Sequence, residues 1–377
     1  MALRTANQCL QRINELCSDR TLRIMNVCGG HERSITQAGL RAALPDTLEL
    51  IPGPGCPVCV CPEDDIEQAI DLALTNQAIL VAFGDMLRVP INGPKSEPRS
   101  LEEARATGAD VRSVASPWDA ARIAQKNPDR CVIFFAAGFE TTMAPVAALI
   151  AAGPPENLLF LLSGRRTWPA VAMLLETGRA RFDALIAPGH VATIMGVNEW
   201  AFVPAQYNVP TAVAGFHTES LLAAIEAVLT QTAAGIRRLD NTYPEVAQAN
   251  GNTRARTCLE TVMQTVDAKW RGIGTIEKSG FELAPEFRHL RAAPSKATLQ
   301  RTRTTAREMP PGCECASVVL GQRYPNECPL YGKGCPPPRS GPAWCLMKGR
   351  VASGGQAGSE ADYAENLPIS TRPEYGT

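Results

Sequence analysis

The chain has 377 residues, 45% of them hydrophobic, and its 37 lysine and arginine residues nearly balance its 38 aspartate and glutamate residues. This length predicts two or three domains with sizeable cores, and the balanced charge argues against nucleic acid as a partner. No apolar run reaches the roughly 18 residues of a membrane span, so we expect a cytoplasmic protein without a membrane partner. In that reducing compartment, 13 cysteines favour metal or redox chemistry over a disulfide scaffold.

Helix and strand signals alternate along the first third of the chain. An amphipathic helix is predicted over residues 4–17, and three short apolar runs follow it, each ending in a turn. This alternation predicts a parallel α/β unit over residues 1–115. Its strands are predicted at residues 22–27, 48–51 and 78–83.

A second α/β series begins with the helix start Ser116-Pro117-Trp118 and extends to residue 283. Beyond it, at residues 284–352, the hydrophobic periodicity of helices and strands fades, while proline and cysteine accumulate. This predicts a small third unit that is held together by a bound ligand. The glycine, serine and acidic content of residues 353–377 predicts a mobile tail. Strands of the second series are predicted at residues 131–137, 157–163, 184–187 and 211–214.

A turn between a predicted strand and a predicted helix holds three cysteines within six residues, Cys56, Cys59 and Cys61. The C-x-x-C spacing of Cys56 and Cys59 is shared by redox dithiols and zinc knuckles, so both readings stay open. A helix N-terminus lowers the pKa of a nearby thiol, whereas the acidic first turn that begins at Glu63 opposes this. The direction of the net pKa shift is therefore open as well.

Other reactive side chains follow predicted parallel strands, and the carboxyl ends of such strands are where ligands bind. If these turns converge on the thiol loop, thiols, an imidazole, a carboxylate and hydroxyls surround one cleft. For His31, the roles of metal ligand and of surface residue both stay open. For Glu140, the roles of site residue and of solvent-exposed loop acid both stay open. His190 is a weaker candidate for the site. The candidates are Cys28 and His31 after the first strand, and Glu140, Thr141 and Thr142 after the strand at residues 131–137.

Five cysteines near the C-terminus form a separate set. Their spacing lacks the close pairs that zinc fingers use, whereas iron–sulfur clusters accept more scattered thiolates and often have a Cys-Pro step beside them. Cys-Pro occurs at Cys328 and at Cys335. We therefore expect a [4Fe–4S] cluster on Cys313, Cys328, Cys335 and Cys345, with Cys315 as a spare thiol.

Six motifs occur in the order typical of the HypD family, the hydrogenase formation proteins of [NiFe]-hydrogenase maturation. The chain resembles this family from about Arg23 to Cys345. The resemblance implies two Rossmann-like domains and a small [4Fe–4S] domain. It also implies two partners, the small chaperone HypC and the cyanide donor HypE. The motifs are Cys28–His31, Gly53–Cys59, Gly84–Pro90, Gly138–Thr142, Gly189–Val191 and Trp270–Gly272.

The resemblance also assigns roles to residues. It implies that Cys28, with the neighbouring His31, helps to hold an iron ion that receives cyanide and carbon monoxide. Cys56 and Cys59 would then be a redox dithiol between this iron and the cluster. Glu140, Thr141 and Thr142 match a facing motif from the second domain, which could hydrogen-bond a ligand or the partner.

The sequence departs from the family pattern at three places. Arg33 stands where a second histidine is common, Cys61 where an apolar residue is usual, and Ser353 lies near the place of an expected cysteine. The fourth cluster ligand is then Cys345 or Cys315. The expected function is a metallocentre assembly scaffold rather than a conventional enzyme; the alternatives are a stand-alone thiol–disulfide oxidoreductase and a binding paralogue without the cluster.

Overall fold

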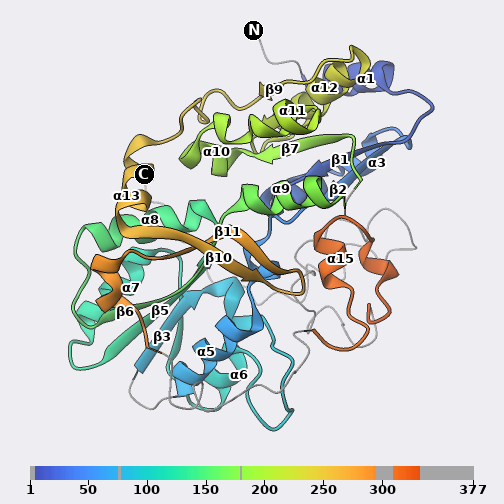
Figure 1. The fold of residues 1–377 in the computed structure, drawn as a ribbon. Helices are drawn as coiled ribbons and strands as arrows, with labels where there is room; N and C mark the ends of the chain where they lie inside the picture. Colours follow the sequence, from blue (N-terminus) through green and yellow to red (C-terminus); the bar gives the residue numbers. More distant parts are fainter. Residues whose placement is uncertain (1–4, 75–77, 179–180, 294–308, 332–377) are drawn as a thin grey trace, which may run out of the picture.

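The computed structural model describes residues 5–74, 78–178, 181–293 and 309–331. The expected tail at residues 353–377, and with it Cys335 and Cys345, lies outside these ranges. Eleven strands in the described ranges form two sheets, and most of their pairings are parallel. This arrangement fits two Rossmann-like α/β domains (Figure 1).

The first sheet has five parallel strands in the order β2-β1-β7-β8-β9. Apolar side chains alternate between its two faces because successive residues of a strand point in opposite directions. Ile24 of β1 packs towards helices α1 and α12, and Met25 packs towards α9 and α10. The strands are β1 Leu22–Asn26, β2 Leu48–Pro52, β7 Ala184–Pro188, β8 Thr211–Ala214 and β9 Leu239–Asn241.

The second sheet has six strands in the order β10-β11-β6-β5-β3-β4. Its four strands from β6 to β4 are parallel, and the antiparallel β10–β11 hairpin joins the edge at β6. Strand β5 is buried on both faces, as expected for a parallel strand covered by helices on each side. The strands are β3 Ala78–Phe83, β4 Val111–Val114, β5 Cys131–Gly138, β6 Leu158–Arg165, β10 Met263–Trp270 and β11 Gly274–Leu283.

Helices cover both faces of each sheet (Figure 1). The α-helices are α1 Ala6–Leu16, α2 Gly29–Gln37, α3 Leu40–Ala43, α4 Pro57–Val60, α5 Glu63–Leu74, α6 Leu101–Ala106, α7 Pro117–Lys126, α8 Glu140–Ala151, α9 Thr167–Thr177, α10 Gly189–Met195, α11 Phe202–Tyr207, α12 Thr218–Ala233, α13 Thr253–Val262 and α15 Cys315–Val319. The 3₁₀ helices are η1 Gly84–Arg88, η2 Val197–Trp200, η3 Pro285–Leu290 and η4 Pro325–Glu327. In the described ranges, none of these helices is long and apolar enough to cross a membrane.

The two sheets are interleaved along the chain. The first sheet takes β1 and β2 from the N-terminal part and β7 to β9 from residues 184–241, whereas β3 and β4 lie in the second sheet. The division expected from the sequence, 1–115 and 116–283, thus differs from the strand membership of the sheets. The physical reason is pairing: Leu80 of β3 lies opposite Ile133 of β5, and β7 pairs with β1.

The segment at residues 309–331 packs beside the edge strand of the first sheet. Leu320 joins the core formed by Met25 and Ile51. Two polar contacts accompany this burial: Arg23 Nη2 donates to the carbonyl of Gly321 at 3.2 Å, and Tyr324 Oη donates to Glu49 Oε1 at 2.6 Å. The segment that carries these cysteines is therefore anchored to the first sheet through Leu320, Gly321 and Tyr324.

Candidate functional site

A pocket of about 290 Å³ lies at the carboxyl ends of both sheets. Its wall on the side of the first sheet includes Cys28, Cys56 and His190, and its wall on the side of the second sheet includes Thr141 and Thr142. Each of these residues directly follows or closely follows a parallel strand, which is why turns from distant parts of the sequence meet here.

Cys28 lies two residues after the end of strand β1 and is the N-cap residue of helix α2. The side chain is buried, and this burial raises the pKa of the thiol to about 12, although the backbone amides of His31 and Gly30 favour the thiolate. Its Sγ lies 3.9 Å from Nδ1 of His190. Cys28 is thus a neutral thiol at pH 7 that faces a pocket and an imidazole.

Two glycines hold the turn after β1 against the thiol loop. The amide of Gly29 donates to the carbonyl of Gly55 at 3.0 Å. A Cβ at Gly55 would lie 2.5 Å from the carbonyl carbon of Val27, so the loop reaches the backbone before Cys28 only without a side chain. This contact places Cys28 and Cys56 on the same wall of the pocket.

Cys56 and Cys59 are joined by a disulfide that spans helix α4, with Cα atoms 5.3 Å apart. Both cysteines are buried, and Cys56 lines the pocket. The neighbouring Cys61 is a free thiol whose Sγ lies 3.4 Å from the Ser163 hydroxyl. Burial raises the pKa of Cys61 to about 12, so this extra thiol is not poised to attack the disulfide.

His31 is fully buried behind the pocket wall. Its Nδ1 lies 2.8 Å from Oδ1 of Asn26, and its Nε2 lies 3.0 Å from the carbonyl oxygen of Ala214. Burial lowers the pKa of the ring to about 3, so the imidazole is neutral and donates to one of these oxygens. Both ring nitrogens face protein oxygens in this arrangement.

His190, a weaker candidate from the sequence, lines the pocket. It follows strand β7, which pairs in parallel with β1, so its turn lies next to that of Cys28. Its ring packs edge-on against Phe216 at 4.5 Å between centroids, and burial lowers its pKa to about 4. The signal that could have found it is the shared strand edge.

Only some of the predicted site residues in the turn after β5 line the pocket. Thr141 and Thr142 lie on its wall, whereas Glu140 is fully buried beside it. The carboxylate of Glu140 accepts hydrogen bonds from the amide and the hydroxyl of Thr167, both at 2.7 Å. Burial raises the pKa of Glu140 to about 6, so the residue is a buried anchor for the start of helix α9 rather than a solvent-exposed acid.

Three of the C-terminal cysteines lie in the described ranges, and Cys335 and Cys345 lie outside them. The pKa of Cys313 is lowered to about 6, first by a hydrogen bond with the Cys315 side chain and also by the positive charge of Arg271. Cys315 and Cys328 are buried. Among the described residues there is no group of three or more histidine, cysteine or acidic side chains that could hold a metal ion.

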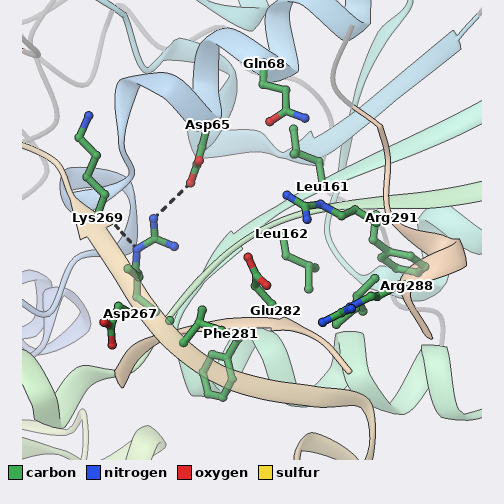
Figure 2. A pocket seen from close by; sticks show the side chains of 16 residues that line it. Asp65, Gln68, Leu161, Leu162, Asp267, Lys269, Phe281, Glu282, Arg288 and Arg291 are labelled. Carbon is green, nitrogen blue, oxygen red and sulfur yellow. Dashed lines mark hydrogen bonds and ion pairs between the residues drawn. The ribbon is translucent and has the colours of Figure 1, made fainter. Parts of the chain in front are cut away.

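A second pocket, of about 220 Å³, runs along β6 and the β10–β11 hairpin (Figure 2). In this pocket the Arg165 guanidinium donates to Asp65 Oδ2 at 3.2 Å and to the backbone carbonyl of Lys269 at 3.0 Å; Asp65 and Lys269 are labelled in Figure 2. No thiol and none of the predicted site residues line this second pocket. Of the predicted site residues, Cys28, Cys56, Thr141 and Thr142 line the pocket beside Cys28 instead.

The fold and the site define a class: a two-sheet α/β protein with a thiol-lined pocket at the strand ends. The family model for HypD, described as a hydrogenase formation family, matches residues 4–350. The chain therefore belongs to the HypD family, as the sequence motifs indicated.

Curated relatives support this assignment over most of their length. The hydrogenase maturation factor HypD of Escherichia coli is 37% identical over 330 residues, which covers 85% of this chain and 84% of the relative. HypD of Rhodobacter capsulatus is 36% identical, with 85% of each chain covered. The hydrogenase expression/formation protein HupD of Azotobacter chroococcum is 36% identical, with 88% of each covered.

Proposed function

We propose that this chain is a cytoplasmic [NiFe]-hydrogenase maturation factor that forms a scaffold with a HypC-type small chaperone. On this scaffold, an iron ion receives two cyanides and one carbon monoxide, with cyanide supplied by a HypE-type partner. The observation that carries the proposal is the wall of the pocket beside Cys28, where a free thiol and a disulfide-bonded cysteine lie on two loops in direct contact.

Iron is cargo in this proposal, and Cys28 is the residue that holds it. Because burial keeps the thiol protonated, binding of iron must displace that proton, and affinity should rise with pH. A thiolate suits low-spin ferrous iron that also carries strong-field ligands. The ligand role of His31, expected from the family, stays a prediction.

The disulfide is the second functional element of the proposal. Its reduction takes up two electrons and two protons and yields the dithiol Cys56 and Cys59 on the pocket wall. The hydroxyls of Thr141 and Thr142 face the same pocket and are placed to hydrogen-bond a ligand or the chaperone. Glu140 positions this turn by binding Thr167.

The C-terminal cysteines suit a resident [4Fe–4S] cluster in their chemistry. Cys313 and Cys328 supply two of the four proposed ligands, and the lowered pKa of Cys313 favours the thiolate that such a cluster needs. Cys335 and Cys345, or Cys315 in place of Cys345, would complete the set. When bound, such a cluster supplies one-electron redox chemistry.

Complementation tests the function as a whole. In a bacterium that lacks its own member of this family, wild-type protein should restore hydrogenase activity and co-purify with the HypC-type chaperone. Cys28→Ala should abolish activity while the protein remains folded, whereas Cys258→Ala, at a half-buried thiol outside the pocket, should leave activity intact. Full activity of Cys28→Ala would refute the scaffold role of this pocket.

A thiol–disulfide oxidoreductase is the second candidate, because the Cys56–Cys59 disulfide lies at a pocket. Turnover of a generic disulfide substrate without any partner would favour it. A binding paralogue without the cluster is the third candidate. Anaerobic iron and sulfide analysis with electron paramagnetic resonance tests it, since absence of bound iron after reconstitution would favour that paralogue.

A further inference from the structure

We propose that His190, through Nδ1, is the imidazole that binds the iron together with Cys28. The inference rests on the proposed function, because it adds a second protein ligand to the same iron site. It assigns to His190 a role that the sequence motif placed at His31.

The topology brings His190 to Cys28. Strands β1 and β7 are parallel neighbours with Asn26 opposite Ile186, and the amide of Val27 donates to the carbonyl of Ile186 at 3.0 Å. The turns that follow the two strands therefore leave the sheet at the same edge. Cys28 lies on one of these turns and His190 on the other.

The distance between the two side chains suits a shared metal ion. Cys28 Sγ and His190 Nδ1 are 3.9 Å apart. One metal–sulfur bond and one metal–nitrogen bond together span about 4.4 Å for a divalent first-row ion, so a single ion reaches both atoms without a backbone shift. Both residues also line the pocket, which leaves room for the cyanide and carbon monoxide ligands.

The surroundings hold the His190 ring in place. Phe216 packs edge-on against it, and a Cβ at Gly30 would lie 2.8 Å from the Phe216 ring and 3.5 Å from Cys28 Sγ. On the other side, a Cβ at Gly189 would lie 2.3 Å from the carbonyl oxygen of Ala214. The absence of a side chain at either glycine thus lets the turns that carry Cys28 and His190 pack closely around the Phe216 ring and strand β8.

His31 has the opposite environment. It does not line the pocket, and its two ring nitrogens lie within 2.8 Å and 3.0 Å of the oxygens of Asn26 and Ala214. To bind the iron, the fully buried ring of His31 would have to turn one nitrogen away from an oxygen that lies at hydrogen-bond distance. Nδ1 of His190 already faces the Cys28 thiol, with which it would share the ion.

Co²⁺ serves as the spectroscopic probe, and the chain simplifies the assignment because it has four histidines. One equivalent is added to the anaerobic full-length protein after its [4Fe–4S] cluster has been reconstituted, so that the C-terminal cysteines are already occupied. In the difference spectrum a thiolate-to-cobalt absorption band reports Cys28, and a paramagnetically shifted, exchangeable imidazole N–H proton resonance reports a bound histidine. The variants are Cys28→Ala, His190→Ala and His31→Gln, with His289→Ala, at an exposed histidine, as the matched control.

The inference predicts that His190→Ala keeps the thiolate band, loses the N–H resonance and binds Co²⁺ more weakly by a factor on the order of 100. His289→Ala and, if it folds, His31→Gln should keep both signals. Survival of the resonance in His190→Ala, or a thiolate band without any imidazole resonance in the wild type, overturns the inference while the iron site at Cys28 stands. A thiolate band that survives in Cys28→Ala overturns the proposed site and the inference together.

Discussion

Gly55 decides how closely the two loops of the site approach each other. Substitution by alanine would place a methyl group 2.5 Å from the carbonyl carbon of Val27, so one loop must move. We expect Gly55→Ala to lower the free energy of unfolding by about 3 kcal/mol and to weaken metal binding at Cys28. Urea denaturation and Co²⁺ titration measure both effects.

Gly84→Ala is the matched control, since a Cβ there would meet its nearest neighbour, Ser113, at an ordinary 3.9 Å. Its stability should stay within about 1 kcal/mol of the wild type. Equal effects of the two substitutions would mean that close approach at Gly55 does not shape the site.

Arg271 and Glu63 form a buried ion pair at 2.7 Å, with side chains that are 3% and 1% exposed. Loss of one partner leaves the other charge buried, so we expect Arg271→Leu to cost about 3–5 kcal/mol in urea unfolding. Lys269→Met, which breaks the exposed pair with Asp64, should cost less than about 1 kcal/mol. Similar costs for both variants would contradict this difference.

Glu140 should make stability fall as pH rises. Its pKa is raised from 4.5 to about 6 in the folded protein, so between these values the native state binds the proton that the unfolded state has lost. The carboxyl therefore lowers the free energy of unfolding by about 2 kcal/mol between pH 4.5 and pH 6, with little change above.

Denaturation of Glu140→Gln across this pH range checks the direction of the pH dependence. In this variant the free energy of unfolding should no longer decline as the pH rises. In Glu156→Gln, at an exposed glutamate, it should decline as in the wild type. A wild-type contribution from Glu140 that rises with pH would contradict the raised pKa.

At the scale of elements, Tyr324 connects the C-terminal cysteine segment to strand β2 through Glu49. A hydrogen bond to a carboxylate contributes about 1.5–3 kcal/mol, so we expect Tyr324→Phe to increase amide hydrogen exchange over residues 315–322. Tyr207→Phe removes a comparable bond to Glu176 elsewhere and should leave this segment protected. Unchanged exchange in Tyr324→Phe would show that apolar packing alone, as at Leu320, holds the segment.

The positions of the strands could be predicted from the sequence better than the strands with which they pair. The apolar runs at residues 22–27 and 131–137 correspond closely to β1 and β5, because a strand buried on both faces leaves a short continuous apolar run. That β3 pairs with β5 and β7 with β1 depends on contacts between distant segments, which no local pattern records.

Prediction of the candidate site from the sequence was limited in the same way, because contacts between distant segments leave no local pattern. Glycines beside Cys28 and the C-x-x-C spacing drew attention to the loops that line the pocket, because these patterns are local in the sequence. The burial of Glu140 and the approach of His190 to Cys28 depend on how turns from different strands meet. Residues within a motif could therefore be found from sequence, whereas their orientation and their partners from other turns could not.

At the scale of the whole molecule, two sheets present their carboxyl ends to one pocket. The C-terminal segment packs beside the first sheet (Figure 1). The first sheet supplies the thiols and the imidazole, and the second supplies the threonines that face them. This division suits the proposed scaffold, in which one half would hold the metal and the other would contact its ligands.

Infrared spectroscopy of anaerobically purified protein in complex with its HypC-type chaperone tests the central claim most directly. The account predicts stretching bands of iron-bound cyanide and carbon monoxide in the wild type and in Cys258→Ala, and their loss in Cys28→Ala together with the bound iron. Bands of unchanged position and intensity in Cys28→Ala would contradict it, because the iron would then be held elsewhere.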